Sequence, residues 1–367
     1  MIDLDEQIAQ ILRERAEGDV DTNRLLRASR ARGRRRQLHR RVAAGTALSL
    51  VGALGVVGVT GTGPDGLTGR LPWTAAKPAA TPAGATPVPP RVDGVPGAAA
   101  DPALVGSDPT VLHFGLDPTR VRYLGWSVVR GHTESVRLSV RDDQPVHVQV
   151  SRTPESLSSS VSFGNVEVDV ARLGIQSFDG TIHPTSGGAS GLVTSWNPAP
   201  GLYARAVILQ GDRAGLERAV GALRWNEARS CAVPLRLDAL PDGAPINTCS
   251  VDVSAYPKLV TSDFTLGRAA NQIMFVTYRY ASGAGTRTEG NRTIAGRPAN
   301  LSADGSTLDL LGIPRTTVSV NFNWQWEGRR PADAEPGATS GFTEADATTV
   351  LAGARVVDDP TRPQSWK

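Results

Sequence analysis

The side chains most able to do chemistry lack the spacing that catalytic motifs require. A zinc hydrolase places two histidines four residues apart on one helix with a glutamate between them, and no pair in this chain has that spacing. The stretch from Ser186 to Leu192 has a leucine where a nucleophile elbow needs its last glycine, so we interpret it as a glycine-rich loop. The five histidines are His39, His113, His132, His147 and His183.

Two further pairs are candidates for a site. Asp142 and Asp143 could act as acid and base, but adjacent carboxylates in a turn after a strand point apart and are usually solvated. Trp324 and Trp326 share one face of a predicted strand, where they would form either a platform for a sugar or peptide or a part of the core. The sequence therefore predicts a protein that is not an enzyme and needs no metal or cofactor.

The positive charge is concentrated at the N-terminus. Residues 1–41 contain 11 arginines and seven acidic residues, a net charge of +4, so the rest of the chain carries −1. Residues 42–62 contain no charged side chain and are long enough to cross ~30 Å of hydrocarbon at ~1.5 Å per residue. The positive-inside rule then predicts a cytoplasmic N-terminus and an exported C-terminal domain. The arginines nearest this span are Arg34, Arg35, Arg36, Arg40 and Arg41.

This pattern predicts a single-pass protein of the cell membrane, with the lipid bilayer as a partner. An uncleaved anchor is favoured over a cleaved signal peptide, because about 40 residues precede the apolar run. Gly45, Ser49 and Ala53 share one helix face, so a homodimer through the transmembrane helix stays open. Contact with specific nucleic acid is not expected.

A short amphipathic helix is predicted near the N-terminus. Asp3 can cap it and Gly18 can end it, and its apolar side chains would lie on one face. Because so short a helix is marginal alone in water, this face is expected to bind a cytoplasmic regulatory protein or, alternatively, to lie on the membrane. The partner-binding residues predicted in this way are Leu4, Ile8, Ile11 and Leu12.

The remaining chain divides by composition into a linker and two modules. Residues 63–109 are rich in proline and alanine and are expected to be a disordered linker. Residues 110–228 and 229–357 contain short runs that alternate apolar and polar side chains, as in antiparallel strands, and 358–367 form a tail. The predicted strands cover 121–129, 136–140, 146–150, 166–170, 202–209, 273–280 and 318–326.

Helical spacing appears once in each module, over 212–224 and 343–355. The two helices would each follow a series of strands, which favours an internal duplication, although any two amphipathic helices share such a stripe. The predicted fold class is α+β: a cytoplasmic helix, one transmembrane helix, a disordered linker and a β-rich antiparallel extracytoplasmic domain of two tandem modules, each ending in a helix.

The two cysteines, Cys231 and Cys249, both lie in the part predicted to be exported. An oxidising compartment favours a disulfide between them, worth roughly 3 kcal/mol in the chain-entropy model. The Pro241–Asp242–Gly243 turn between them predicts a hairpin. We interpret the bond as a structural staple.

The layout resembles that of actinobacterial single-pass membrane proteins of the anti-sigma-factor-like class, which carry an extracytoplasmic sensory domain. The stretch from Cys231 to Ala244, with its Leu-Pro-x-Gly turn, and the strand and helix ending near Val357 are similar to the domains of such proteins. No cysteine precedes Cys231, so the zinc-binding anti-sigma motif is absent. The resemblance implies a sensory or regulatory protein with an unknown envelope ligand. The alternative is a passive surface protein that binds wall or lipid components.

Overall fold

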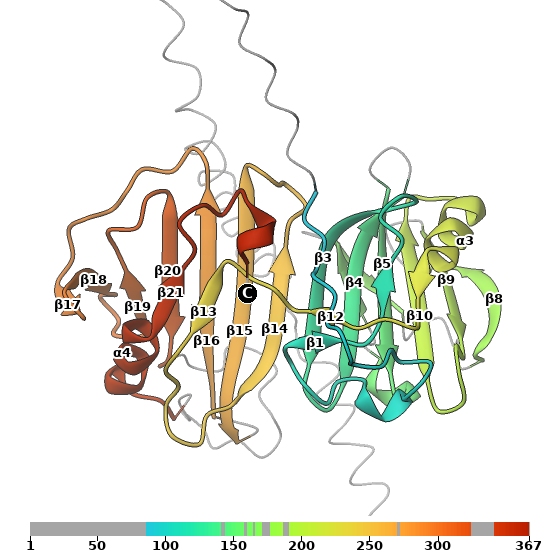
Figure 1. Ribbon diagram of the computed structural model, residues 1–367, viewed down its shortest axis with the longest axis horizontal. Helices are drawn as coiled ribbons and strands as arrows, with labels where there is room; N and C mark the ends of the chain where they lie inside the picture. Colours follow the sequence, from blue (N-terminus) through green and yellow to red (C-terminus); the bar gives the residue numbers. More distant parts are fainter. Residues whose placement is uncertain are drawn as a thin grey trace, which may run out of the picture. The chain divides into compact units, whose positions relative to one another are not determined.

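The computed structural model describes residues 86–140, 144–157, 160–163, 166–170, 177–185, 191–269, 272–323 and 341–366 (Figure 1). All of these belong to one compact unit, Lys77–Lys367. The predicted cytoplasmic segment, the predicted span over 42–62 and residues 63–85 of the predicted linker lie outside the described residues.

The predicted fold class needs a correction. No helix in the described ranges is long and apolar enough to cross a membrane. The two α-helices there have nine residues each, about 14 Å of axial rise against ~30 Å of hydrocarbon. The fold is mostly β, and a transmembrane helix is not part of what the structure shows.

One antiparallel sheet of 13 strands forms the centre of the fold, in the order β17-β18-β19-β20-β16-β15-β14-β3-β4-β5-β10-β9-β8. We call residues 115–224 the first half and residues 235–356 the second half. They meet where β3 pairs with β14, and Ser127 lies opposite Ser250 in that pairing. We call this pairing the seam.

The first half contains β2 (Gly115–Leu116), β3 (Arg122–Val129), β4 (Thr133–Ser139), β5 (Pro145–Ser151), η3 (Pro154–Ser156), β6 (Ser160–Phe163), β7 (Val166–Asp169), β8 (Asp179–Pro184), β9 (Gly191–Trp196), β10 (Tyr203–Leu209), α3 (Arg213–Gly221) and β11 (Leu223–Arg224). The second half contains β13 (Leu235–Leu237), β14 (Ile246–Asp252), β15 (Leu259–Ala269), β16 (Gln272–Ala281), β17 (Arg292–Ile294), β18 (Arg297–Leu301), β19 (Thr307–Leu310), β20 (Thr316–Asn321), α4 (Glu344–Ala352) and β21 (Ala354–Val356). Outside the halves lie η1 (Pro102–Leu104), β1 (Val111–Leu112), β12 (Arg229–Ser230) and η5 (Pro363–Ser365).

The two halves repeat one topology. Outward from the seam, the first half runs β3-β4-β5-β10-β9-β8 and the second runs β14-β15-β16-β20-β19-β18, with β17 added at its edge. A helix follows β10 and β20, and the short strand after each helix pairs with a strand at the start of its half, β11 with β2 and β21 with β13. The repeat extends to an ion pair, since Arg224 contacts Asp117 and Arg355 contacts Asp238. The topology does not test the exact residues at which the predicted modules begin and end, so these boundaries stay predictions.

The two predicted helices of the body are present and are shorter than expected. Asp212 caps α3, and Thr343 forms a capping box with Asp346 at the start of α4. Each helix ends early because the chain enters β11 or β21. The helices bury one stripe each, consisting of Gly215, Leu216 and Ala219 in α3 and Ala347, Val350 and Leu351 in α4.

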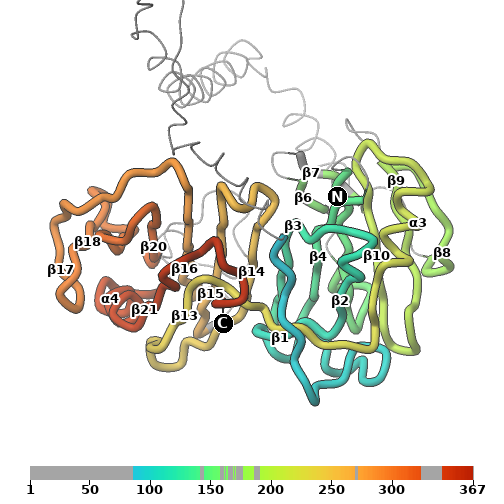
Figure 2. Tube along the Cα trace, turned by 45° about the horizontal axis from the view of Figure 1, so that its top comes forward, coloured from blue at the N-terminus to red at the C-terminus, as the bar shows by residue number. Residues whose placement is uncertain are grey.

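The hairpin of β6 and β7 covers the face of the first half opposite α3 (Figure 2). Alternation along β10 explains this two-sided burial, because Ile208 faces α3 while Val207 faces the hairpin. The hairpin buries a small cluster of its own, consisting of Val161, Val168, Val170, Val193 and Val207. Strands of the first half are therefore buried on both faces.

The predicted hairpin between the cysteines is wrong. The chain does turn at Pro241, whose carbonyl accepts a bond from the Ala244 amide. However, β13 pairs with β21 instead of β14. The reason is tertiary, because both edges of β14 are already paired, with β3 and β15, and α4 brings β21 to β13.

Candidate functional site

A cavity of about 410 Å³ lies along the seam and is the best candidate site in the described part of the chain. Its volume falls within the ~300–1,000 Å³ typical of ligand sites. Four strands contribute to it, three from the first half and one from the second. Its lining consists of Trp126, Ser127, Ser135, Arg137, His147, Ser250, Val251 and Asp252.

Three serines on adjacent strands present hydroxyl groups to this cavity. Ser127 of β3 lies between Ser135 of β4 and Ser250 of β14 in the strand register, so the side chains point to the same face. All three are half-buried, and their hydroxyl groups have no hydrogen-bond partner among the described residues. Each hydroxyl can donate one bond and accept two, so together they favour a ligand rich in polar groups.

An ion pair crosses the seam beside the serines. Nη2 of Arg137 in β4 lies 2.8 Å from a carboxylate oxygen of Asp252 in β14. Burial is the largest influence on Asp252 and opposes its ionisation, but the Ser254 hydrogen bonds and Arg137 together outweigh it and lower the pKa of this carboxyl. The site therefore carries one cation and one anion, a net charge of zero.

Gly125 makes the ion pair possible. A Cβ atom at this position would lie 2.4 Å from the carbonyl oxygen of Val251 and 2.8 Å from Nη2 of Arg137. Any larger residue would displace the guanidinium from its path toward Asp252. This is a close-approach glycine at a β-bulge of β3, where the register with β4 shifts.

His147 borders the cavity in a state unsuited to proton transfer. Burial, with a smaller effect of Arg137, lowers the pKa of its imidazole to about 4, so the ring is neutral at pH 7. Both ring nitrogens are shielded from solvent and have no hydrogen-bond partner among the described residues. The ring of Phe163 in the β6–β7 hairpin lies edge-on to it at 6.4 Å. A base that activates a serine would contact its hydroxyl, and His147 does not.

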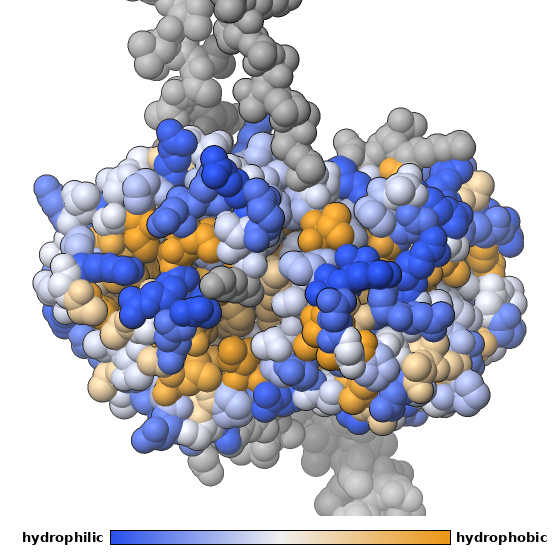
Figure 3. Space-filling view, in the orientation of Figure 1, coloured by the Kyte–Doolittle hydropathy of each residue, from blue (hydrophilic) through white to orange (hydrophobic). Residues whose placement is uncertain are grey.

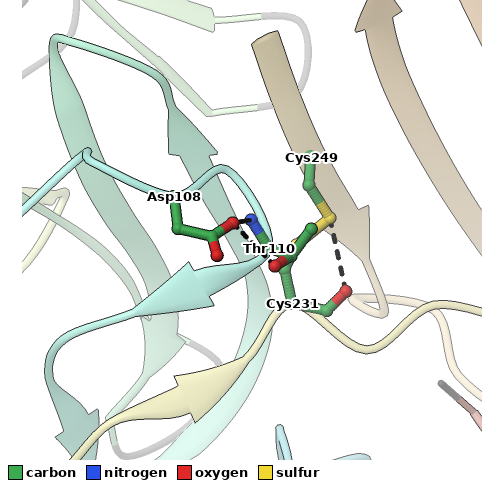
Figure 4. Close-up of a disulfide and its surroundings, with 4 residues drawn as sticks. All are labelled: Asp108, Thr110, Cys231 and Cys249. Carbon is green, nitrogen blue, oxygen red and sulfur yellow. Dashed lines mark hydrogen bonds between the residues drawn. A yellow bond between two sulfur atoms is a disulfide. The ribbon is translucent and has the colours of Figure 1, made fainter. Parts of the chain in front are cut away.

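The cysteines form the predicted disulfide (Figure 4). It joins the segment after β12 to β14, and Cys249 lies opposite Val128 in the seam. The Cys231 amide also donates to the carbonyl of Thr110, at 2.6 Å. The bond therefore fastens the connection between the halves to the strand that forms the second-half wall of the cavity.

A second polar cluster is structural. The carboxylate of Glu134 in β4 is fully buried and accepts bonds from the amides of Gly106 and His113, at 2.9 and 2.5 Å. Its Oε1 also lies 2.6 Å from Nδ1 of His113. Because these contacts use both oxygens, the cluster holds the segments before and after β1 to the sheet and leaves no group for a ligand.

Most of the other residues singled out in the sequence are not among the described residues. Asp142, Asp143, Ser190, Trp324 and Trp326 lie outside the described residues. So do the predicted partner-binding and topology residues near the N-terminus. Within the described ranges, no group of three or more histidine, cysteine, aspartate or glutamate side chains could hold a metal ion. Among the described histidines, only His147 lines the cavity.

Sequence reasoning missed the cavity because its residues come from four strands. Arg137 and Asp252 are 115 positions apart, and nothing in their local sequence distinguishes them from other charged residues on strands. The serines follow the ordinary polar alternation of a half-buried sheet. Knowing that β3 pairs with β14 would have placed these residues together. That pairing joins strands from different halves, and local sequence patterns do not reveal it.

Comparisons with known proteins add little to this geometry. The chain matches no protein-family model and no curated protein. Among solved structures, it is similar to the crystal structure of MucB in complex with MucA(peri), with 15% sequence identity and a TM-score of 0.21. The match covers 66% of this chain and 71% of that chain. At this level of similarity the comparison assigns the chain to no family.

Proposed function

We propose that the folded body is the extracytoplasmic sensory module of a regulatory envelope protein of the anti-sigma-like type. In this proposal the seam cavity binds a polar envelope ligand of no net charge, and the N-terminal segment contacts a cytoplasmic regulatory protein, a sigma factor. The body acts by binding and catalyses no reaction. The disulfide supports the placement outside the cytoplasm, because structural disulfides persist in oxidising compartments.

The observation that carries the proposal is the ion pair between Arg137 and Asp252. Its two side chains come from different halves and lie in the wall of a cavity. A ligand that bonds to either group competes with the ion pair, so binding changes the contact between the halves. A sensory domain needs such a difference between its free and bound states.

The test uses the full chain in its host. We expect Arg137→Gln and Asp252→Asn to change sigma-factor-dependent transcription, because each removes one half of the ion pair. Arg213→Gln is the matched control, since Arg213 lies exposed on α3 with only a 3.9 Å contact to Glu217. Transcript profiles equal to the parent in both cavity variants would exclude the cavity as a sensory site.

The partner is tested separately. We expect a sigma factor to co-purify with the parent chain and to be lost when Ile8 and Ile11 are replaced by Asp, because the substitutions place charges in the only predicted apolar stripe of residues 1–41. Circular dichroism should show an unchanged folded body. If no sigma factor co-purifies with the parent, the passive surface protein becomes the better description.

A further inference from the structure

A second cavity, of about 460 Å³, lies within the second half. It is bounded by the turn before β18, the β19–β20 loop, and β21 with the residues that follow it. Figure 3 shows apolar surface interspersed with hydrophilic residues over this part of the second half. Its apolar lining includes Pro298, Leu311, Ile313, Val356, Val357 and Pro360.

The corresponding place in the first half is filled by aromatic rings. Trp225 follows the cap of α3, Asp212, by the same number of residues as Val356 follows the cap of α4, Thr343. The two residues therefore occupy equivalent positions. The indole of Trp225 stacks on Phe114 with ring centroids 5.6 Å apart, and it lies edge-on to Trp196 at 6.3 Å.

The second half has smaller residues at all three positions. By strand register, Leu235 corresponds to Phe114, and Leu310 corresponds to Trp196. The flanking loops match, since the amide of Leu202 donates to Ala199 and that of Thr316 donates to Ile313. In the same frame, the smaller Val356 lines a cavity at the position where Trp225 packs against two aromatic rings.

Two opposite charges border this space. Arg355 is already bonded to Asp238, with Nε 3.3 Å from Oδ2. Arg297, half-buried at the start of β18, and Asp358, exposed after β21, have no side-chain partner among the described residues. The cavity thus offers one unpaired guanidinium and one unpaired carboxylate beside an apolar interior.

We propose that this cavity binds a free aromatic amino acid. The ring occupies the apolar space that Trp225 fills in the first half. The carboxylate of the ligand bonds to Arg297, for which a charge-assisted bond to a guanidinium is the strongest arrangement. The ammonium group bonds to Asp358. This site is separate from the seam cavity and does not depend on its function.

The test titrates L-phenylalanine and L-tryptophan into the full chain and measures binding by calorimetry. Two analogues separate the charged contacts: N-acetylphenylalanine lacks the ammonium group, and phenylalaninamide lacks the carboxylate. We expect both analogues to bind at least tenfold more weakly than phenylalanine, because each loses a charge-assisted hydrogen bond. L-Leucine is expected to bind more weakly than the aromatic amino acids.

Three variants assign the contacts. Arg297→Gln should weaken binding of phenylalanine at least tenfold and leave binding of phenylalaninamide, which lacks the carboxylate, unchanged. Asp358→Asn should likewise weaken binding of phenylalanine and leave binding of N-acetylphenylalanine, which lacks the ammonium group, unchanged. Val356→Trp should fill the cavity and abolish binding. Arg292→Gln is the control, because Arg292 is bonded to Glu344 outside the cavity.

Two outcomes would overturn the proposal. One is the absence of binding by both aromatic amino acids at millimolar concentration. The other is binding that Arg297→Gln and Asp358→Asn both leave unchanged in chains whose circular dichroism equals that of the parent. The second outcome is decisive even if Val356→Trp fails to fold, because the two charge variants alter only half-buried or exposed side chains.

Discussion

The guanidinium of Arg137 and the carboxylate of Asp252 face each other at 2.8 Å across the seam, joining β4 of the first half to β14 of the second. The side chains are 26% and 39% exposed, so solvent screens the pair only in part. Their contact gives the two halves an electrostatic link in addition to the backbone pairing of β3 with β14.

We expect a double-mutant cycle on this pair, with Arg137→Gln and Asp252→Asn, to give a coupling energy of about 1 kcal/mol. Urea unfolding of the four proteins measures it. The lowered pKa of Asp252 means that the unfolded chain binds the proton more readily, so this stabilisation is present above the carboxyl's ordinary pKa and is lost as the pH falls through the lowered value. A coupling energy within error of zero at pH 7 would show that the ion pair does not help to hold the halves together.

The disulfide is expected to stabilise the body by about 3 kcal/mol, because it closes a loop between positions 18 apart. Replacing both cysteines by alanine should lower the free energy of unfolding by this amount. Dithiothreitol should lower that of the parent similarly and leave the variant unaffected. Mass spectrometry of an unreduced digest should find the cross-linked peptides. Recovery of both cysteines as free thiols would contradict the structure.

His147 should make the body sensitive to acid. Its pKa is about 4 in the folded chain and close to 6.5 in the unfolded chain, so the unfolded state binds more protons between these values. Stability should therefore fall by up to about 3 kcal/mol as the pH drops from 6.5 to 4. Urea unfolding at a series of pH values measures the slope.

The second half suggests the matched substitution for His147. Strand register places Phe275 of β16 at the corresponding position, since Arg137 pairs with His147 and Thr265 pairs with Phe275. We expect His147→Phe to retain the fold and to remove most of this pH dependence. His183→Gln, on the edge strand β8, should keep the full slope. An unchanged slope in His147→Phe would mean that another group titrates.

Glu134 should be among the most sensitive positions of the first half. Glu134→Gln keeps the size of the side chain. However, the amide N–H₂ of glutamine would face a backbone N–H that now donates to the carboxylate, so two donors would meet. A cost of about 1–3 kcal/mol is expected in urea unfolding. Glu155→Gln, at an exposed position in η3, should change stability by less than about 0.5 kcal/mol. Equal stability of the two variants would refute the structural role of Glu134.

The sequence by itself determined those features of the body that depend on local spacing. Alternation of apolar and polar residues predicted strands that are present as β3, β4, β5, β7, β10 and β16. Helical spacing next to Asp212 and Thr343 predicted α3 and α4, because a cap and an apolar stripe are both properties of a short segment. The disulfide between Cys231 and Cys249 followed from there being only two cysteines, in a part of the chain predicted to be exported.

Only the tertiary structure decided how these elements combine. The pairing of β13 with β21 and of β3 with β14 joins segments whose ends are far apart in sequence, and local patterns do not encode the choice among such partners. The same reason explains the candidate site. Arg137 and Asp252 become neighbours only when the seam forms. The cavity beside Val356 forms only where β18, the β19–β20 loop and the residues after β21 come together.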